Sequence, residues 1–405
     1  MNMNGLLDGI TILDLTRVVS GPSCTRSLAD LGAEVIKVEP PEGDLWRRGV
    51  PKVDDVSVGF AQLNAGKLFM SVDLGTDKGK ELVFKLALQS DVVVENYRPG
   101  VAERLGLGYE AIARDKPDII YCSISGYGQD GPARDRRAYA PIIHAELGLL
   151  HQNAREWGTE PMPETASHVD FAVGMQASNG ILAALYYRAN TGQGVYVDAS
   201  MAETMLAMNE ATSIEINGGL GDQLSPFRPG KAPILQVKNG TYAQLPGNPL
   251  TMIFAVARAI GKESELEALG WTEPTSMKID DAVTKLREWA MEFDDVEALE
   301  SALDKIRVPV GVVRSLAETV DADWAIARNA FKDVTTGNGT IKVPLSPLRI
   351  SKHYVGPRTG VSRQGENNRS ILAERLGMAD DELDQLEREN VLITEDRRAK
   401  DKSPF

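Results

Sequence analysis

The sequence predicts an α/β protein in which a large, Rossmann-like domain holds a parallel sheet and a smaller α/β domain is inserted. Short apolar runs alternate with helical segments through the first half of the chain. Two of these runs, 10–15 and 34–39, flank a helical segment at 24–31, a spacing typical of a βαβ unit. A Gly- and Pro-rich stretch at 217–233 then precedes a shorter set of elements. From residue 339 the chain is expected to return, so that the sheet is built from both chain ends.

Apolar periodicity and helix-stop signals predict the other elements of the large domain. Strands are expected at 68–74, 91–95, 119–125 and 195–198. Helices are expected at 78–88, 109–114, 171–188, 201–208 and 380–389. Ligands bind outside the carboxyl ends of parallel strands. The residues that follow these strands are therefore the first candidates for a binding site.

The smaller domain is expected to contain both strands and helices. Strands are predicted at 240–244 and 307–313, and helices at 250–260, at 280–293 and from a capping Ser315 onward. The expected division of the chain is a large domain at 1–216, a linker at 217–233, a small domain at 234–330, and a return to the large domain with a tail at 331–405.

Composition limits the classes of function. The net charge of −14 argues against a non-specific nucleic-acid surface, and no apolar run is long enough to span a membrane. The N-terminus has no basic region typical of a signal peptide. Cys24 and Cys122 lack metal-ligand spacing, and buried thiols in a reducing, cytoplasmic compartment are the simplest interpretation. The first strand is not followed by Gly-x-Gly-x-x-Gly, so a dinucleotide cofactor is not predicted. No metal or redox cofactor is expected either.

Asp170 is the candidate nucleophile. The helix predicted from Phe171 to Arg188 places it at the N-cap or in the first turn, where free N–H groups and the helix dipole favour an anion. Such a carboxylate is expected to stay ionised and can act as a nucleophile. From this stretch alone, a simple capping role for Asp170 is the alternative interpretation.

A set of short motifs runs along nearly the whole chain in a fixed order. The runs are 7–14, 31–39, 64–67, 95–101, 104–107, 125–128, 131–132, 191–198, 308–311, 365–366 and 371–377. Together with Asp170, this ordered set resembles the class III CoA-transferases. That family includes formyl-CoA transferase, carnitine CoA-transferase and α-methylacyl-CoA racemase.

The resemblance implies a reaction and an assembly. Asp170 matches the family's catalytic aspartate, which attacks an acyl-CoA thioester and forms an aspartyl acyl anhydride. The CoA thiolate then returns to form an aspartyl-CoA thioester, and a carboxylic acid accepts the CoA. The expected partners are therefore an acyl-CoA and a carboxylic acid, with no tightly bound cofactor. The family's interlocked homodimer is expected as well.

The resemblance also implies a CoA-binding site at the strand ends. The matching positions are Val19, Ser20, Asp73, Gly75, Asn96, Tyr97, Arg98, Arg104, Arg137, Ala138 and Tyr139. Local charge agrees with this assignment, because a basic group stands out in an acidic protein and arginine suits phosphate. This group consists of Arg98, Arg104, Arg134, Arg136 and Arg137. Ordinary surface salt bridges are the alternative interpretation of the group.

Departures from the family pattern bear on the substrate. Val19 replaces a glutamine of formyl-CoA transferase, and 246–249 lacks that enzyme's glycine run, so oxalate or formate is not favoured. Tyr139 stands where racemases carry a histidine, and His168 is interpreted as a surface or supporting residue. A small dicarboxylate such as succinate or mesaconate is expected, from Arg17, Arg47 and Arg48 near the site. An α-methylacyl-CoA racemase and a non-catalytic CoA-binding subunit of a heteromer stay open as alternatives.

Overall fold

The structure is a computed structural model that describes residues 5–219 and 232–394, so most of the expected linker at 217–233 lies outside the described residues. The described chain forms two compact units. The first consists of 5–147, 163–209 and 323–394, and the second of 148–162, 210–219 and 232–322. The expected domain boundaries remain a prediction.

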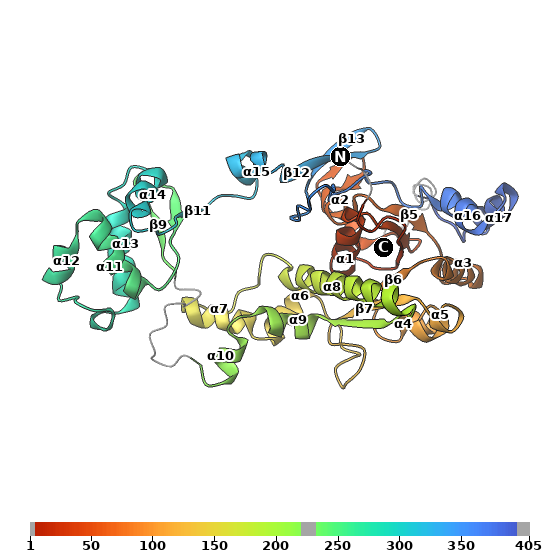
Figure 1. The fold of residues 1–405 in the computed structure, drawn as a ribbon, viewed down its shortest axis with the longest axis horizontal. Coiled ribbons are helices and arrows are strands. Elements are labelled where there is room, and N and C mark those ends of the chain that lie inside the picture. The colour runs from red at the N-terminus through yellow and green to blue at the C-terminus, as the bar shows by residue number, and fades with distance from the viewer. Residues whose placement is uncertain (1–4, 220–231, 395–405) are drawn as a thin grey trace. The chain divides into compact units, whose positions relative to one another are not determined.

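The first unit is organised by a six-stranded, all-parallel sheet (Figure 1). Its strands are β1 (Thr11–Asp14), β2 (Glu34–Glu39), β5 (Leu68–Ser71), β6 (Val92–Glu95), β7 (Ile120–Ser125) and β8 (Tyr196–Ser200). The order across the sheet is β5-β2-β1-β6-β7-β8, which is the doubly wound order of Rossmann folds. The strand order therefore reverses between β1 and β6, and a crevice is expected at their carboxyl ends.

The expectation that both chain ends build this sheet is wrong. All six strands lie within 11–200. The C-terminal part adds a hairpin, β12 (Phe331–Thr336) and β13 (Gly339–Pro344), two helices, α16 (Asn368–Leu376) and α17 (Asp380–Arg388), and a single antiparallel bridge. The physical reason lies at the edge strand β5. The amide oxygens of Asn367 and Asn368 accept the N–H groups of Phe69 and Ser71 at 2.8 Å, so side chains occupy the edge that another strand would pair with.

Helices cover both faces of the sheet, as a parallel sheet requires. The other helices of the first unit are α1 (Ser20–Asp30), α2 (Val58–Asn64), α3 (Asp77–Leu88), α4 (Val101–Arg104), α5 (Tyr109–Asp115), α6 (Ala140–Glu146), α8 (His168–Thr191), α9 (Met201–Met208) and α15 (Asp323–Ala327). A 3-10 turn, Leu45–Arg48, and a small pair, β3 (Lys52–Val53) and β4 (Val56–Ser57), complete it. Side chains of α3, α5, α16 and α17 share one apolar core with the strands. Helices α1 and α8 pack on the sheet as well.

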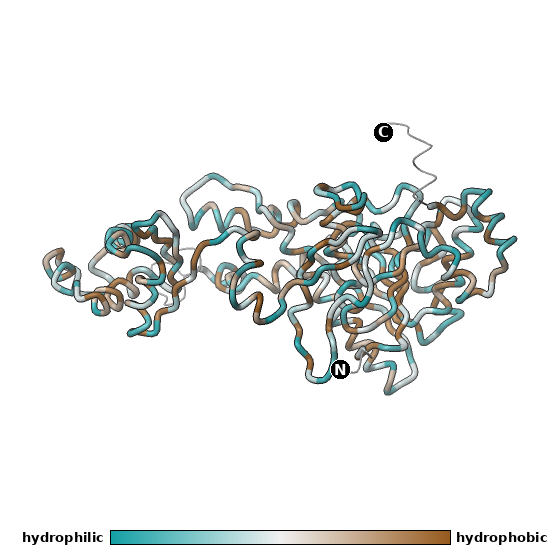
Figure 2. Tube along the Cα trace, turned by 90° about the horizontal axis from the view of Figure 1, so that it is seen from above, coloured by the Kyte–Doolittle hydropathy of each residue, from teal (hydrophilic) through white to brown (hydrophobic). Residues whose placement is uncertain are grey.

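Every residue of β1, β6 and β7 is buried. Hydrophobic residues accordingly run through the sheet strands in the interior of this unit (Figure 2). Strands that are buried on both faces read as continuous apolar runs. This is why the sequence pattern located β2, β6 and β7 to within one residue at each end.

The second unit contains a short antiparallel sheet and a helical layer. Its strands are β9 (Ile234–Gln236), β10 (Tyr242–Gln244) and β11 (Gly311–Val312). Its helices are α7 (Leu149–Trp157), α10 (Thr212–Ile216), α11 (Pro249–Ile260), α12 (Glu263–Ala268), α13 (Ile279–Ala290) and α14 (Val296–Asp304), with 3-10 turns at Pro274–Ser276 and Glu318–Asp321. The apolar faces of α11, α12, α13 and α14 form a separate core around Trp289, together with residues of the strands.

Two expectations for this unit are corrected. The strand expected at 307–313 is reduced to Gly311–Val312, because Arg307 is left-handed (φ 57°) and Pro309 has no N–H to pair. The helix expected from Ser315 is only the 3-10 turn Glu318–Asp321. Ser315 binds the Glu318 carboxylate through both its N–H and its hydroxyl, at 2.7 Å each, in a local motif that a longer helix does not follow.

The long helix α8 crosses α1 at a glycine (Figure 1). A Cβ atom on Gly174 would lie 2.1 Å from the Ser23 hydroxyl oxygen and 2.7 Å from the backbone oxygen of Ser20. One turn further on, the Ser178 hydroxyl donates to the backbone oxygen of Cys24 at 3.1 Å. Asp170, Gly174 and Ser178 recur every four residues and therefore share the face of α8 that packs against α1.

We expect Gly174→Ala to destabilise the protein by about 1–3 kcal/mol, because the added methyl group overpacks a backbone contact that cannot rotate away. The measurement is urea unfolding followed by circular dichroism. Gln176→Ala, at an exposed position of the same helix, should stay within about 0.5 kcal/mol of the wild type. Equal stability of the two variants would contradict the close α1–α8 packing.

Candidate active site

A buried ion pair stabilises the loop between β1 and α1. The Lys67 ammonium lies 3.0 Å from the Asp14 carboxylate, and both side chains are fully buried. Asp14 also accepts the hydroxyl protons of Thr16, at 2.5 Å, and Thr25, at 2.7 Å. Burial opposes ionisation of Asp14, but the charges of Lys67 and Lys37 and the two hydroxyl groups outweigh it and lower its pKa to about 2. Both ends of this loop are therefore fixed to one carboxylate.

Backbone strain marks the middle of the same loop. Val18 has a φ of 70°, a left-handed conformation that is unusual for a β-branched residue. Its N–H donates to the buried carboxylate of Asp44, at 3.2 and 3.3 Å, and Lys37 pairs with that carboxylate at 3.1 Å. Strained backbone persists where surrounding contacts over-determine it, and it concentrates at functional sites. The loop is thus a candidate part of the site.

The end of β6 closes on this loop at the point where the strand order reverses. The Asn96 side-chain amide accepts the Arg17 N–H at 2.8 Å and donates to the Arg17 carbonyl at 2.9 Å and to the Ser20 hydroxyl at 3.2 Å. Beside it, the Tyr97 N–H donates to the buried Glu95 carboxylate at 2.7 Å. Four predicted site residues, Val19, Ser20, Asn96 and Tyr97, are thereby brought together at the crevice.

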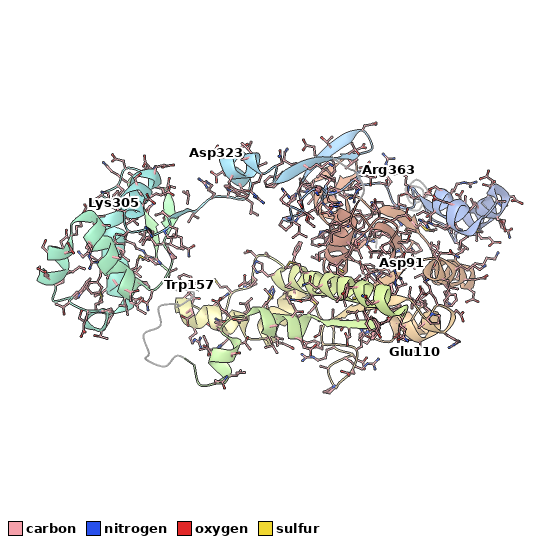
Figure 3. All side chains as sticks on the ribbon, in the orientation of Figure 1. Asp91, Glu110, Trp157, Lys305, Asp323 and Arg363 are labelled. Carbon is pink, nitrogen blue, oxygen red and sulfur yellow. The ribbon has the colours of Figure 1, made fainter. Side chains whose placement is uncertain are left out.

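Both ends of α8 are bound to neighbouring elements of the first unit. At its C-terminus the Arg188 guanidinium pairs with Asp91 at 2.8 Å, and Asp91 also accepts the first N–H of β1. Asp91, labelled in Figure 3, precedes β6. The helix then ends at Gly192, which is left-handed with a φ of 74°. At its N-terminus the buried imidazole of His144 accepts the Val169 N–H at 3.4 Å.

Asp170 lies in the first turn of α8, which begins at His168, so the expected helix-start position is confirmed. Its ionisation is less favoured than the sequence predicted, because burial raises the pKa of the carboxyl group from 3.8 to about 6. At pH 7 about nine in ten such groups are still ionised. The site therefore offers a desolvated carboxylate, a more reactive nucleophile than a solvated one.

The predicted basic group divides into free and paired members. Across residues 5–219 and 232–394, Arg98, Arg104 and Arg137 form no ion pair, and all three are exposed. Arg136 pairs with Glu146, and Arg134 lies 3.7 Å from Asp135. Surface salt bridges therefore account for only two of the five cations.

Two of these cations converge over a left-handed glycine. A Cβ atom on Gly100 (φ 82°) would lie 3.2 Å from an Arg104 guanidinium nitrogen and 3.9 Å from an Arg134 nitrogen. Two like charges held around one point favour a bound anion.

The other predicted residues lie at neighbouring strand ends. Arg137, Ala138 and Tyr139 return onto the end of β7, where a Cβ atom on Gly126 would lie only 2.3 Å from that of Ala138. Asp73 and Gly75 lie further away, after the edge strand β5, where the Asp73 carboxylate accepts the Gly75 N–H at 2.8 Å in a turn before α3. They lie two strands from β1 and are not brought into contact with the crevice residues.

A dicarboxylate was expected partly because of Arg47, and the structure does not support that use of Arg47. The Arg47 guanidinium is bound to Glu39 at 2.7 Å and lies over the Phe60 ring at 3.9 Å, so it is already neutralised. Arg48 lies at the end of the same 3-10 turn. Arg17 remains the best-placed cation, because its guanidinium lies over the Tyr97 ring at 5.4 Å and its nearest acid, Glu42, is 4.0 Å away. His168 is exposed beside Glu164, as expected of a surface residue.

Sequence reasoning missed three supporting groups. The run 64–67 matched the family pattern, but its pairing with Asp14 depends on the fold and not on spacing. Asp44 and His144 carried no sequence signal. Among the described residues, no three His, Cys, Asp or Glu side chains form a metal-binding group. Nor does any described helix combine the length and hydrophobicity needed to cross a membrane.

Fold and site define a doubly wound α/β protein with a partly buried carboxylate, Asp170, in the first turn of α8. A family model described as "CoA-transferase family III" matches residues 7–368. The chain therefore belongs to CoA-transferase family III, and its class of activity is CoA transfer.

Curated relatives and a solved structure match along most of the chain. The formyl-CoA:oxalate CoA-transferase of Streptomyces avermitilis is 31% identical, over 96% of this chain and 100% of its own. The succinyl-CoA:glutarate CoA-transferase of Mus musculus is 33% identical, over 94% of this chain and 88% of its own. The succinyl-CoA:mesaconate CoA-transferase of Haloarcula hispanica is 30% identical, over 91% and 96%. The crystal structure of a CAIB/BAIF family protein from Brucella suis superimposes with a TM-score of 0.79 at 28% identity, covering 92% of this chain and all of that one.

We expect Asp170→Asn to raise the free energy of unfolding at pH 8 by about 1 kcal/mol. The pKa of Asp170 is higher in the folded state than the ordinary value of 3.8, so its charge opposes folding above about pH 6. The gain should shrink as the pH falls through 6 and vanish below about 4, where both states hold the proton. Urea unfolding at several pH values measures it. Asp130→Asn, at an exposed position, should change stability by less than about 0.5 kcal/mol throughout. A lower stability of Asp170→Asn at pH 8 would contradict the buried charge.

Proposed function

We propose that this protein is a class III CoA-transferase that moves CoA between an acyl-CoA thioester and a small dicarboxylic acid such as succinate or mesaconate. One observation carries the proposal. Asp170 is a partly buried carboxylate in the first turn of α8, on the helix face that packs against the start of α1. Membership of the family supports the same reaction class.

The proposed reaction uses Asp170 once as the nucleophile and then as the carrier of the acyl group and of CoA. A carboxylate oxygen attacks the thioester carbonyl, the C–S bond breaks, and an aspartyl acyl anhydride and the CoA thiolate result. The thiolate then attacks the aspartyl carbonyl, which releases the donor acid and leaves an aspartyl-CoA thioester. The acceptor carboxylate attacks this thioester and expels the thiolate, forming a second anhydride. Attack of the thiolate on the acceptor's acyl carbon frees Asp170 and the new acyl-CoA.

The burial of Asp170 fits this chemistry in two ways. An anhydride hydrolyses readily, so the nucleophile must be shielded from bulk water. A pKa of about 6 leaves the carboxylate ionised at neutral pH while making it a better nucleophile than an ordinary aspartate. The free N–H groups of the first helical turn favour the negative charge that develops there.

The proposed CoA site follows the crevice and its rim. Val19, Ser20, Asn96 and Tyr97 would line the thioester end, where the loops after β1 and β6 meet. Arg98, Arg104 and Arg137 would bind the phosphates, because these exposed cations have no acid partner among the described residues. Ala138 and Tyr139 would contact the nucleotide end, with Asp73 and Gly75 at the far edge of the sheet.

A dicarboxylate acceptor is favoured by Arg17, whose guanidinium is oriented by Tyr97 and lies next to the strained loop. Two of the relatives are named for succinyl-CoA with glutarate or mesaconate, which supports this class of acid. Val19 replaces the glutamine of formyl-CoA transferase, so oxalate is the less favoured acceptor although another relative is named for it. We further propose an interlocked homodimer, a cytoplasmic location and no tightly bound cofactor.

The racemase alternative has less support. A racemase needs a second base beside Asp170, and the position of its histidine is held by Tyr139, which is 63% exposed. His144 cannot replace that base while its ring nitrogen accepts the Val169 N–H. A non-catalytic CoA-binding subunit has no need of a desolvated carboxylate with a raised pKa.

We expect Asp170→Asn to abolish CoA transfer, because an amide cannot form the anhydride. The wild type, incubated with succinyl-CoA and hydroxylamine, should gain a hydroxamate on Asp170 that peptide mass spectrometry detects. Donors and acceptors are screened as pairs, with succinyl-, acetyl- and formyl-CoA against glutarate, mesaconate and oxalate. Asp130→Asn is the matched control and should retain full activity. Unchanged transfer by Asp170→Asn would overturn the proposed mechanism.

We expect Arg104→Ala to raise KM for the acyl-CoA about ten- to a hundred-fold while kcat stays nearly constant. Losing one charge-assisted contact costs about 1.5–3 kcal/mol, and a contact made equally in ground and transition states affects binding alone. KM for the acceptor acid should hardly change. Arg114→Ala, an exposed arginine on α5, serves as the control. A collapse of kcat with an unchanged acyl-CoA KM would remove Arg104 from the phosphate site.

A further inference from the structure

We propose that His144 is a positioning residue for Asp170, acting as a neutral hydrogen-bond acceptor that fixes the first turn of α8. The inference rests on the proposed function, because Asp170 matters only as the nucleophile. His144 comes from α6, 25 positions before Val169, and is 1% exposed. Its Nε2 atom accepts the Val169 N–H at 3.4 Å, and Val169 is the residue directly before Asp170.

The first turn of a helix leaves N–H groups without intrahelical acceptors. In α8 the N-cap residue, Ser167, makes no side-chain cap bond within the described part of the chain. The His144 imidazole supplies an acceptor from another element instead. The contact is made only while Nε2 carries no proton, because an imidazolium ring can only donate.

The surroundings of His144 favour the neutral ring. Burial lowers the pKa of His144. The charge of His168, whose ring centre is 6.3 Å away, lowers it as well, whereas the carboxylate of Glu164 raises it. Glu164 and His168 come from α8 and the segment before it. On the other helix that packs against α6, the titratable group is the exposed Glu203 of α9, and on α6 itself Glu146 is bound by Tyr127 and Arg136. At neutral pH the acceptor state therefore dominates.

Protonation of Nε2 would break the hydrogen bond between His144 and Val169. The Val169 N–H would lose its acceptor, and a cation would lie at the positive end of the α8 dipole. Both effects loosen the turn that carries Asp170. CoA transfer then requires two deprotonated groups, His144 and Asp170, whereas a purely structural histidine would leave the requirement at one.

The first test follows hydrogen exchange of the Val169 amide by mass spectrometry with electron-transfer fragmentation, at pH 5 to 8, in the full-length protein without substrate. In His144→Leu, which has no acceptor, protection of Val169 should fall at least about tenfold at every pH. In His144→Gln, whose amide oxygen accepts at every pH, protection should not depend on pH, whereas the wild type should lose protection as acidification protonates His144. Equal protection of Val169 in all three proteins overturns the proposal.

The second test is the pH profile of kcat/KM with succinyl-CoA and glutarate, with thermal unfolding recorded at each pH. The acid limb should approach a slope of two protons in the wild type and one in His144→Gln, with similar kcat at pH 8. His144→Leu should lose about ten- to a hundredfold in kcat, with little change in KM for succinyl-CoA. The matched control is His168→Gln, because His168 is exposed and should keep the two-proton limb.

The outcomes separate this inference from the proposed function. A two-proton limb that persists in His144→Gln refutes control of Asp170 by His144, even if Val169 exchange behaves as expected. Activity retained by Asp170→Asn overturns the CoA-transfer mechanism and, with it, a role for His144 in positioning the nucleophile.

Discussion

The buried pair of Asp14 and Lys67 is the interaction on which the candidate site depends. Both side chains are fully buried, and Lys67 also donates to the Thr25 hydroxyl and the Asn64 amide oxygen at 2.8 Å. Burial lowers the pKa of Lys67 to about 8 in spite of Asp14, so both groups are still charged at neutral pH. Removing either partner would leave an uncompensated buried charge, which destabilises a protein far more than replacing both partners by apolar residues. Its contribution is therefore geometric as much as energetic.

A chain of contacts connects this pair to Asp170, the candidate nucleophile. Asp14 fixes Thr16 and Thr25 at the two sides of the β1–α1 loop, and Asp44 and Asn96 hold the residues between them. The fixed start of α1 then packs against α8 at Gly174, whose missing side chain leaves room for Ser23 and the Ser20 backbone oxygen. Because Asp170 lies one turn before Gly174 on the same face, the position of its carboxylate depends on every one of these contacts.

Local sequence patterns were enough for most of the fold. The apolar runs at β2 and β7 and the stop at Gly192 are local signals, and the alternation of strands and helices predicted a parallel sheet. The sheet edge was not predictable, because two asparagine side chains about 300 positions away, Asn367 and Asn368, take the place of a strand.

The same limit applies to the site. Asp170 could be found from its helix start and its motif, and the free cations from their clustering in sequence. Arg47 was misjudged because its partners, Glu39 and the Phe60 ring, depend on tertiary packing. His144 and Asp44 act on backbone N–H groups of distant segments, and no spacing in sequence encodes such a contact.

The exposed arginines and Asp170 carry their charges in different environments. The protein carries a net charge of −14, yet screening over about 8 Å in physiological salt leaves only nearby groups to act on an anionic ligand. In the proposed CoA site, the exposed arginines would act through such screened contacts, which suit the binding and release of a flexible ligand. Asp170 is instead partly buried in the first turn of α8, and burial raises the pKa of its carboxyl group to about 6. In the proposed mechanism, affinity for the ligand and reactivity of the nucleophile would therefore be set by separate groups, the exposed arginines and the partly buried Asp170.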